Sequence, residues 1–200
     1  ADASWEDIKK IVKESKEYAC ASACIPPCFV KRAKEETGAY ICTVIGFPLG
    51  YQTTNSKVEE ARQAVEDGAD EVDMVINISA VKNKDYGYVQ DEISKVKSAI
   101  GSSKLKVIVE TCYLDTEEKI AACKLVELAG ADYIKTSTGF SEKGADIEDI
   151  KLFKKICPEL KVKAAGGIST LEQARAFRAA GADRIGASKL VEAKRIEDNK

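Results

Sequence analysis

The segment Gly68-Ala69-Asp70-Glu71-Val72-Asp73-Met74-Val75-Ile76 joins the end of one predicted helix to a short apolar run. Its first three residues recur as Gly130-Ala131-Asp132 and Gly181-Ala182-Asp183, each time just before a segment that contains isoleucine. Glycine adopts the left-handed backbone conformation that ends many helices. The repeat therefore indicates equivalent junctions between a helix and the next strand, as repeated βα units require.

Outward from these junctions, short runs rich in Val and Ile alternate with amphipathic segments. The predicted strands are residues 21–25, 40–44, 71–76, 106–110, 133–136, 161–164 and 184–187. The predicted helices are residues 4–18, 27–37, 56–67, 88–100, 116–129, 147–156, 170–180 and 190–196. Asp115 and Thr170 are expected to cap the helices that follow them. This alternation is typical of a parallel sheet covered by helices, either an open doubly wound sheet or a closed barrel.

Eight predicted helices without an intervening linker favour a single α/β domain over residues 1–200, built as a (β/α)8 TIM barrel. Such a barrel has eight strands, whereas only seven are recognisable. The sequence opens with a helix, so we expect a barrel that lacks its first strand in the sequence given.

Composition restricts the function. The 31 basic and 33 acidic residues give a net charge of −2, and no basic run predicts nucleic acid as a partner. No apolar stretch approaches the roughly 18 residues that span a bilayer, so we expect neither a membrane partner nor a location outside the cytoplasm. The chain contains no histidine, which excludes Ser-His-Asp and Cys-His catalysis and disfavours a catalytic zinc.

Seven cysteines are scattered along the chain. Cys20, Cys24 and Cys28 are spaced by four residues, but Pro26 and Pro27 prevent them from sharing one helical face. An odd number of cysteines also argues against a secreted disulfide framework. Reduced thiols are therefore expected, with no metal or other cofactor.

Two lysines end consecutive predicted strands. Lys135 follows Asp132-Tyr133-Ile134, and Lys163 follows Leu160-Lys161-Val162. Neighbouring strands lie about 4.8 Å apart, so two ammonium groups in one apolar interior would repel each other. Repulsion and burial both lower a lysine pKa, and the neutral amine is the form that attacks a carbonyl. The alternative is that either lysine extends to the rim as a solvated charge.

Asp73 lies inside a predicted strand, where an unpaired carboxylate is costly. An inward Asp73 could pair with the lysines and pass protons to water; a solvent-facing carboxylate or a structural ion pair is the alternative. Gly166-Gly167 and Gly186-Ala187-Ser188 each precede a predicted helix, where backbone N–H groups could hold a phosphate. Either glycine segment could instead be an ordinary turn. Cys24 ends the first predicted strand and either faces the site or is an inert thiol.

These residues stand within longer motifs that resemble the deoxyribose-phosphate aldolase family. The similarity runs in order from about Trp5 to Val191, and the motifs are Ile41-Cys42-Thr43-Val44-Ile45-Gly46-Phe47-Pro48-Leu49-Gly50, Glu71-Val72-Asp73-Met74-Val75-Ile76-Asn77, Val109-Glu110-Thr111-Cys112-Tyr113-Leu114, Tyr133-Ile134-Lys135-Thr136-Ser137-Thr138-Gly139-Phe140, Val162-Lys163-Ala164-Ala165-Gly166-Gly167-Ile168 and Arg184-Ile185-Gly186-Ala187-Ser188. The resemblance implies a class I aldolase that reversibly cleaves 2-deoxy-D-ribose 5-phosphate into D-glyceraldehyde 3-phosphate and acetaldehyde.

The resemblance also implies roles for individual residues. Lys135 would form the Schiff base, Lys163 would perturb its pKa, and Asp73 would support proton transfer. The implied substrate- and phosphate-binding residues are Cys24, Thr138, Gly139, Gly166, Gly167, Gly186 and Ser188. The only partner implied besides the phosphosugar is a second copy of the chain, in a homodimer or homotetramer. Because the first strand is missing, an inactive phosphate-binding fragment is an alternative, and another Schiff-base phosphosugar lyase is a second.

Overall fold

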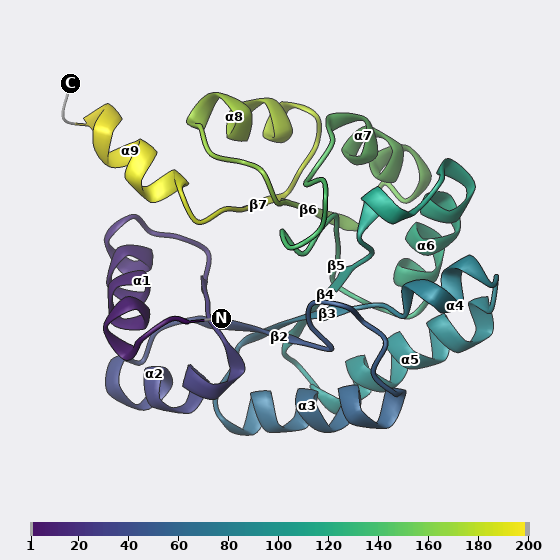
Figure 1. Cartoon of the computed structure of the whole chain (residues 1–200), viewed down its shortest axis with the longest axis horizontal. Coiled ribbons are helices and arrows are strands. Elements are labelled where there is room, and N and C mark those ends of the chain that lie inside the picture. Colours follow the sequence, from purple (N-terminus) through teal and green to yellow (C-terminus); the bar gives the residue numbers. More distant parts are fainter. Residues whose placement is uncertain (1, 199–200) are drawn as a thin grey trace.

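The computed structural model describes residues 2–198, whose strands form one parallel sheet in chain order. The sheet curls into an open ring inside the helices (Figure 1). Its strands are β1 (Ala23–Cys24), β2 (Ile41–Ile45), β3 (Glu71–Val75), β4 (Lys104–Ile108), β5 (Tyr133–Lys135), β6 (Lys161–Ala165) and β7 (Arg184–Gly186). Within the described residues β1 and β7 are the two edges, so the predicted TIM-barrel architecture with seven strands is confirmed.

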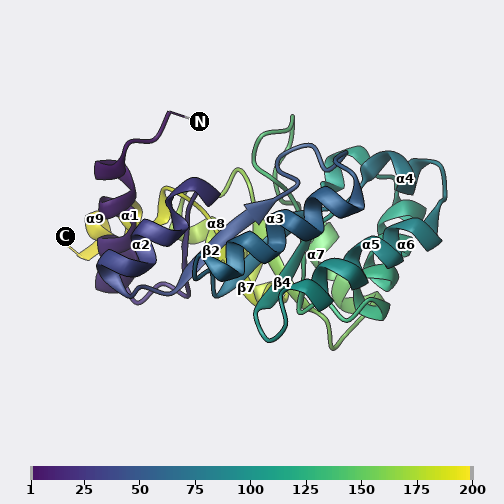
Figure 2. The ribbon, with the colours of Figure 1, turned by 90° about the horizontal axis from the view of Figure 1, so that it is seen from below.

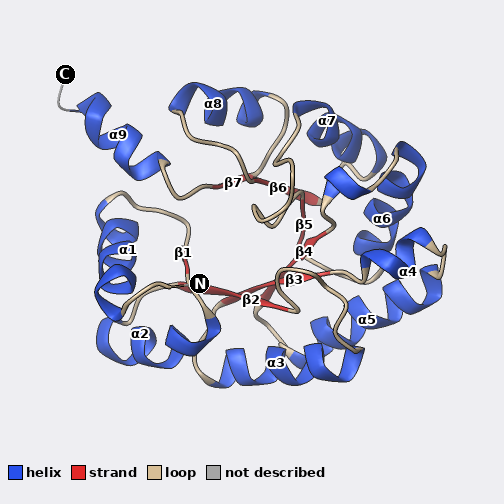
Figure 3. Cartoon of the chain, in the orientation of Figure 1, coloured by secondary structure: helices blue, strands red, loops and turns tan. Residues whose placement is uncertain are grey.

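Helices surround the sheet on its outer side (Figure 3). They are α1 (Trp5–Glu17), α2 (Val30–Thr37), α3 (Thr54–Glu66), α4 (Ile78–Lys82), α5 (Tyr86–Ala99), α6 (Thr116–Leu128), α7 (Ile147–Ile156), α8 (Leu171–Ala179) and α9 (Leu190–Asp198). Two 3-10 turns, η1 (Pro27–Phe29) and η2 (Thr111–Tyr113), complete the structure. The ring is open between α1 and α9, next to the two edge strands.

The Gly-Ala-Asp repeat forms the same contacts at each junction. Asp70 accepts a hydrogen bond from the backbone N–H of Ile41 at 2.7 Å and pairs with Lys34 at 2.8 Å. Asp132 and Asp183 repeat this arrangement with Leu105 and Lys97, and with Val162 and Lys154. Each aspartate thus connects the start of its own strand to the start of the preceding strand and to the helix before that strand. The three junctions are equivalent, as the repeat predicted.

Helix capping also follows the sequence. Asp115 and Thr170 both form complete capping boxes, with Glu118 and Gln173 respectively. Several boundaries differ from the prediction. Thr53 and Asp85 cap α3 and α5, so both helices begin two residues before their predicted starts. The short α4 was not predicted; it begins after Asn77, whose side chain accepts a hydrogen bond from the N–H of Ala80.

The extents of two strands differ from the prediction by more than one residue at an end. β1 contains only Ala23–Cys24 because only these two residues pair with β2. β4 ends at Ile108 rather than at residue 110, since Glu110 adopts a left-handed backbone conformation with a φ of 51°. No helix within residues 2–198 combines the length and the apolar character that crossing a membrane requires.

The loops that follow β2 and β5 emerge at the same end of the sheet (Figure 2). Phe47 of the first loop and Phe140 of the second meet edge to face, with ring centroids 5.4 Å apart. This is the end at which parallel barrels carry their active sites.

Candidate active site

The carboxylate of Asp73 accepts hydrogen bonds from three lysine side chains inside the ring. Its Oδ2 accepts hydrogen bonds from Nζ of Lys135 at 2.8 Å and Nζ of Lys163 at 2.7 Å. Its Oδ1 accepts a hydrogen bond from Nζ of Lys106 at 2.7 Å. All four side chains are buried. The structure therefore brings together the three predicted catalytic residues, Lys135, Lys163 and Asp73, and adds Lys106.

The strand register explains this meeting. Asp73 lies opposite Val44 on β2 and Lys106 on β4, and Lys135 on β5 lies opposite Lys163 on β6. Successive strand residues point to opposite faces of the sheet. Curling of the sheet then brings the inward side chains of β3, β4, β5 and β6 to a common centre.

The electrostatics of the cluster differ from the sequence-based expectation. Burial opposes the ionisation of Asp73, but Lys135, Lys163 and Lys106 together hold its pKa well below the ordinary value. Burial alone would lower the pKa of Lys163, yet the field of Asp73 is stronger and raises it. The sequence-based argument considered only burial and repulsion between the lysines, whereas the carboxylate placed between them raises the pKa of Lys163.

A second carboxylate lies behind the first. Glu71 pairs with Lys106 at 2.7 Å and with Arg184 at 2.7 Å, and its side chain is fully buried. Lys106 thus bridges two carboxylates. Burial alone would lower the pKa of Lys106, but the negative charges of Asp73 and Glu71 outweigh it and raise the pKa. The sequence analysis missed Lys106 and Glu71 because the partner of a mid-strand charge depends on register. The available signal was the alternation of charged with apolar residues in the two strands, at Glu71 and Asp73 and at Lys104 and Lys106.

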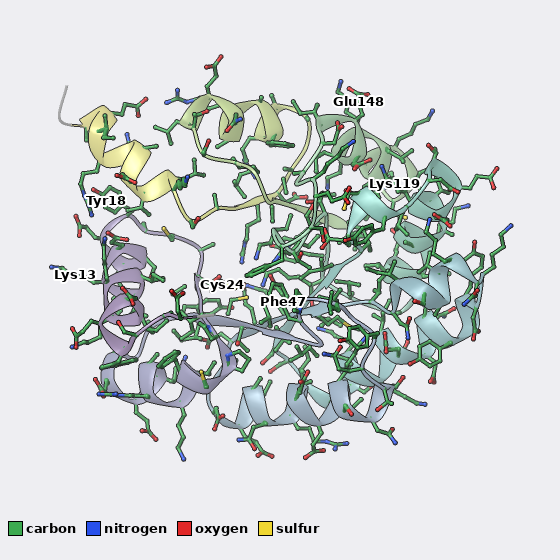
Figure 4. All side chains as sticks on the ribbon, viewed as in Figure 1. Lys13, Tyr18, Cys24, Phe47, Lys119 and Glu148 are labelled. Carbon is green, nitrogen blue, oxygen red and sulfur yellow. The ribbon has the colours of Figure 1, made fainter. Side chains whose placement is uncertain are left out.

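Cys24 lies on the inner side of the ring, which is the first of its two predicted placements (Figure 4). It is opposite Cys42 in the β1–β2 register. The sulfur atoms of both cysteines and a carboxylate oxygen of Asp73 lie within 4.8 Å of one another. This set resembles a metal-binding group, but Lys106 donates to Cys42 at 3.3 Å and to Asp73 at 2.7 Å. A divalent ion would have to displace that ammonium group, so the set is a poor metal site.

The Cys24 thiol should be unusually reactive. A hydrogen bond with Cys42 lowers the pKa of Cys24 to about 6, and the nearby ammonium groups of Lys163 and Lys135 also favour the thiolate. By contrast, burial raises the pKa of the exposed Cys20. At pH 7 we expect iodoacetamide to alkylate Cys24 at least about ten times faster than Cys20, because the thiolate is the reacting form. Peptide mass spectrometry over time measures both rates; equal rates at pH 7 would contradict the assignment.

The predicted phosphate-binding glycines converge at the far side of this cluster. Gly139 and Gly166 both have positive φ angles, +85° and +86°. A Cβ atom added to Gly166 would lie 3.5 Å from Cα of Gly139 and 3.0 Å from Cα of Gly144. A Cβ atom added to Gly144 would lie 2.1 Å from the carbonyl oxygen of Gly166. The backbones of Gly144 and Gly166 therefore approach too closely for side chains. We call Gly139, Gly144, Gly166 and Gly167 the glycine cradle.

A cavity of about 380 Å³ adjoins the glycine cradle, and residues at the starts of α7 and α8 also line it. The start of α8 is less available to an anion than the sequence suggested. Gln173 accepts hydrogen bonds from the N–H groups of Ser169 and Thr170, while its own N–H is bonded to Thr170. Any anion bound here would depend mainly on the cradle amides.

The remaining predicted binding residues have other surroundings. Thr138 donates hydrogen bonds from its backbone N–H and its hydroxyl to Glu110. Ser188 is exposed in the segment between β7 and α9. Gly186 lies beneath the side chain of Lys163: a Cβ atom there would be 2.9 Å from Cε of Lys163. The structure thus gives Gly186 a role in making room for Lys163.

Substitution of Gly186 by alanine should consequently displace the Lys163 side chain. We expect kcat to fall about tenfold or more, because shifts of about 1 Å in catalytic groups have effects of this size. The circular dichroism spectrum should be unchanged. Steady-state kinetics with Gly101→Ala as a surface glycine control measures the effect; equal losses in both variants would contradict the contact.

Comparison with known proteins adds evidence on ancestry. The family model described as "DeoC/LacD family aldolase" matches residues 1–191. A deoxyribose-phosphate aldolase of Clostridium botulinum is 59% identical over 192 residues, which cover 94% of this chain and 87% of the relative. A deoxyribose-phosphate aldolase of Clostridioides difficile is 53% identical over 201 residues, covering 99% and 92%.

Solved structures of aldolases superpose on most of the chain. A structure titled "QR15, an Aldolase" has a TM-score of 0.92 at 42% identity, covering 98% of this chain and 90% of that one. The deoxyribose phosphate aldolase of Aeropyrum pernix, described as having a unique tetrameric structure, has a TM-score of 0.87 at 32% identity and covers 97% and 86%.

Proposed function

The chain belongs to the DeoC/LacD family of aldolases, and we propose that Lys135, Lys163 and Asp73 carry its reaction. That reaction is the reversible cleavage of 2-deoxy-D-ribose 5-phosphate to D-glyceraldehyde 3-phosphate and acetaldehyde through a lysine Schiff base. The observation that supports the residue assignment is the shared Oδ2 atom of Asp73, which holds both lysine Nζ atoms within 2.8 Å.

The two amino groups share one carboxylate oxygen, so a proton can pass between them. Lys163, whose pKa Asp73 raises, is the group that keeps its proton. Lys135 then supplies the neutral amine that attacks the substrate aldehyde. Asp73, whose pKa the three lysines hold well below its ordinary value, holds the two nitrogen atoms and supports proton transfer through water.

The proposed steps follow from this arrangement. The Lys135 amine adds to C1 of the open-chain sugar, and loss of water gives an iminium ion. Water held near Asp73 takes the proton of the C3 hydroxyl group and later returns it to Lys163. As this proton leaves, the C2–C3 bond breaks and its electron pair moves toward the iminium nitrogen. Glyceraldehyde 3-phosphate leaves, and the enamine is protonated at C2 by the Lys163 ammonium group through water. Hydrolysis then releases acetaldehyde and restores the Lys135 amine.

Binding of the substrate phosphate is proposed for the glycine cradle. Gly139, Gly166 and Gly167 would offer backbone N–H groups, with Thr138 and Ser188 at the rim and Gly186 beside Lys163. The adjoining cavity of about 380 Å³ supports this placement for Gly166 and Gly167, which line it together with residues of α7 and α8. Cys24 would face the aldehyde end of the substrate.

The remaining proposals concern the whole molecule. One continuous hydrophobic cluster spans the described helices and strands, which supports a single domain over residues 1–200. We also propose that the protein is a homodimer or homotetramer and that it is cytoplasmic. The tetrameric Aeropyrum pernix relative supports the oligomer, and the seven free cysteines support the location. Light scattering after size-exclusion chromatography measures the oligomeric state.

The activity is tested by coupling the release of glyceraldehyde 3-phosphate, which cleavage of either sugar below would form, to NADH oxidation with triosephosphate isomerase and glycerol 3-phosphate dehydrogenase. We expect turnover of 2-deoxyribose 5-phosphate and none of ketose phosphates such as fructose 6-phosphate. Cleavage of the ketose would favour a transaldolase-like lyase. Binding of the phosphate ester without any turnover would favour an inactive fragment.

A further inference from the structure

Glu110 has a conformation and surroundings that the reaction outlined above does not use. It follows β4 with a φ of 51° and a ψ of 68°, and its exposure is 1%. The other non-glycine residues with positive φ among residues 2–198, Ala19 and Lys84, lie in exposed turns. L-amino acids with a Cβ atom avoid this conformation, so a buried example indicates that the surroundings hold it in place.

The Glu110 carboxylate accepts hydrogen bonds only from the loop after β5 in the contacts found for the described residues. Both of its oxygens accept the backbone N–H of Thr138 at 3.3 Å. Its Oε2 also accepts the hydroxyl groups of Thr138 and Ser141. The Thr138 hydroxyl oxygen in turn accepts the N–H of Phe140 at 3.0 Å. The side chain of Glu110, just after β4, thus holds the first four residues that follow Ser137 in place.

This loop carries two members of the glycine cradle. Gly139 lies between Thr138 and Phe140, and Gly144 packs directly on the carbonyl group of Gly166. The N–H of Ala145 also bonds to the Gly166 carbonyl oxygen at 3.1 Å. A displacement of Thr138 would therefore be passed to the cradle at Gly139, whereas Lys135 is held separately by β-sheet pairing with β4 and β6.

We propose that Glu110 is a positioning residue that sets the affinity for the phosphorylated end of the substrate. A carboxylate would repel a phosphate group at close range, so Glu110 is suited to act through the loop and not by direct contact. Its oxygen lone pairs are already engaged by three loop donors. The inference rests on the proposed phosphate-binding role of the glycine cradle.

Glu110→Gln tests the proposal, since it keeps the size of the side chain but replaces one acceptor oxygen by an amide that donates. Glu142→Gln is the matched control: it removes the same charge from the exposed part of the loop after β5. For 2-deoxyribose 5-phosphate we expect the KM of Glu110→Gln to rise at least about tenfold, with kcat within about twofold, because hydrogen bonds to a charged group are lost. For unphosphorylated 2-deoxyribose, kcat/KM should match the wild-type value.

Three results would overturn the proposal: equal losses on both sugars, a fall in kcat alone, or no change at all. A second measurement tests the role of Glu110 independently of the proposed catalytic activity. The affinity for inorganic phosphate, read from isothermal titration, should fall in Glu110→Gln and stay unchanged in Glu142→Gln. If the wild-type chain cleaved no deoxyribose 5-phosphate but this difference held, the proposed function would fail while the role of Glu110 stood; unchanged phosphate affinity would reject that role.

Discussion

Replacing Lys135 by methionine is expected to lower kcat by about 10⁴-fold or more, the scale on which a lost covalent nucleophile acts. Methionine fills a similar volume but has no amine to form a Schiff base. The fold should survive, because the substitution removes one of two ammonium groups that share Oδ2 of Asp73. The free energy of unfolding should stay the same or increase.

The matched control for this variant is Lys161→Met. Lys161 lies on the neighbouring β6 but is exposed at the opposite end of that strand. Its replacement should leave kcat within about twofold, as is usual for surface substitutions. Steady-state kinetics and urea unfolding of both variants give the comparison. A Lys135→Met protein that retained a tenth of the wild-type rate would exclude Lys135 as the nucleophile.

The second large effect is expected for Asp73→Asn. The substitution removes the anion that three buried lysines share, while leaving a side chain of nearly the same shape. We expect the free energy of unfolding to fall by about 3–5 kcal/mol, the usual cost of removing one partner from a buried ion pair. The rate should fall at least about 10³-fold, since neither lysine would keep its position or charge.

The stability of this variant should depend on pH in a particular direction. In the wild-type protein, Asp73 has a depressed pKa, so its contribution is present above the unfolded pKa of about 3.9 and is lost as pH falls. Lys163 has a raised pKa, so its contribution is present below about pH 10.4 and is lost as pH rises through the folded value. Without Asp73 the buried lysines would become easier to deprotonate on folding. The free energy of unfolding of the wild-type protein should therefore exceed that of Asp73→Asn by most near neutral pH, and this difference should narrow toward pH 10. Urea unfolding of both proteins at several pH values measures it. A difference that widened toward pH 10 would contradict the ion-pair account.

The order of strands and helices could be predicted from the sequence because its signals are local. Gly68, Gly130 and Gly181 end helices, and the aspartates two residues later connect neighbouring strands. The capping residues Asp115 and Thr170 were also predicted correctly. Such features depend on residues within a few positions of each other, so a single sequence is sufficient to identify them.

What the sequence could not provide was the environment of each charge. Lys106 was treated as an ordinary strand residue, although register and sheet curvature place it on both Glu71 and Asp73. The effect of Asp73 on the pKa of Lys163 could not be predicted for the same reason. Glu110 belongs to one of the family motifs but received no role from the sequence, because its bonds to Thr138 and Ser141 join segments about 30 residues apart. These interactions arise only when distant strands become neighbours.

The central claim is that the Lys135 amine forms the Schiff base. Incubation with acetaldehyde and borohydride, followed by peptide mapping, tests it most directly. The account predicts one added ethyl group on the peptide that contains Lys135, and none on that peptide in Lys135→Met. An ethyl group on Lys163 or Lys106 instead, or no stable adduct in an active preparation, would contradict it.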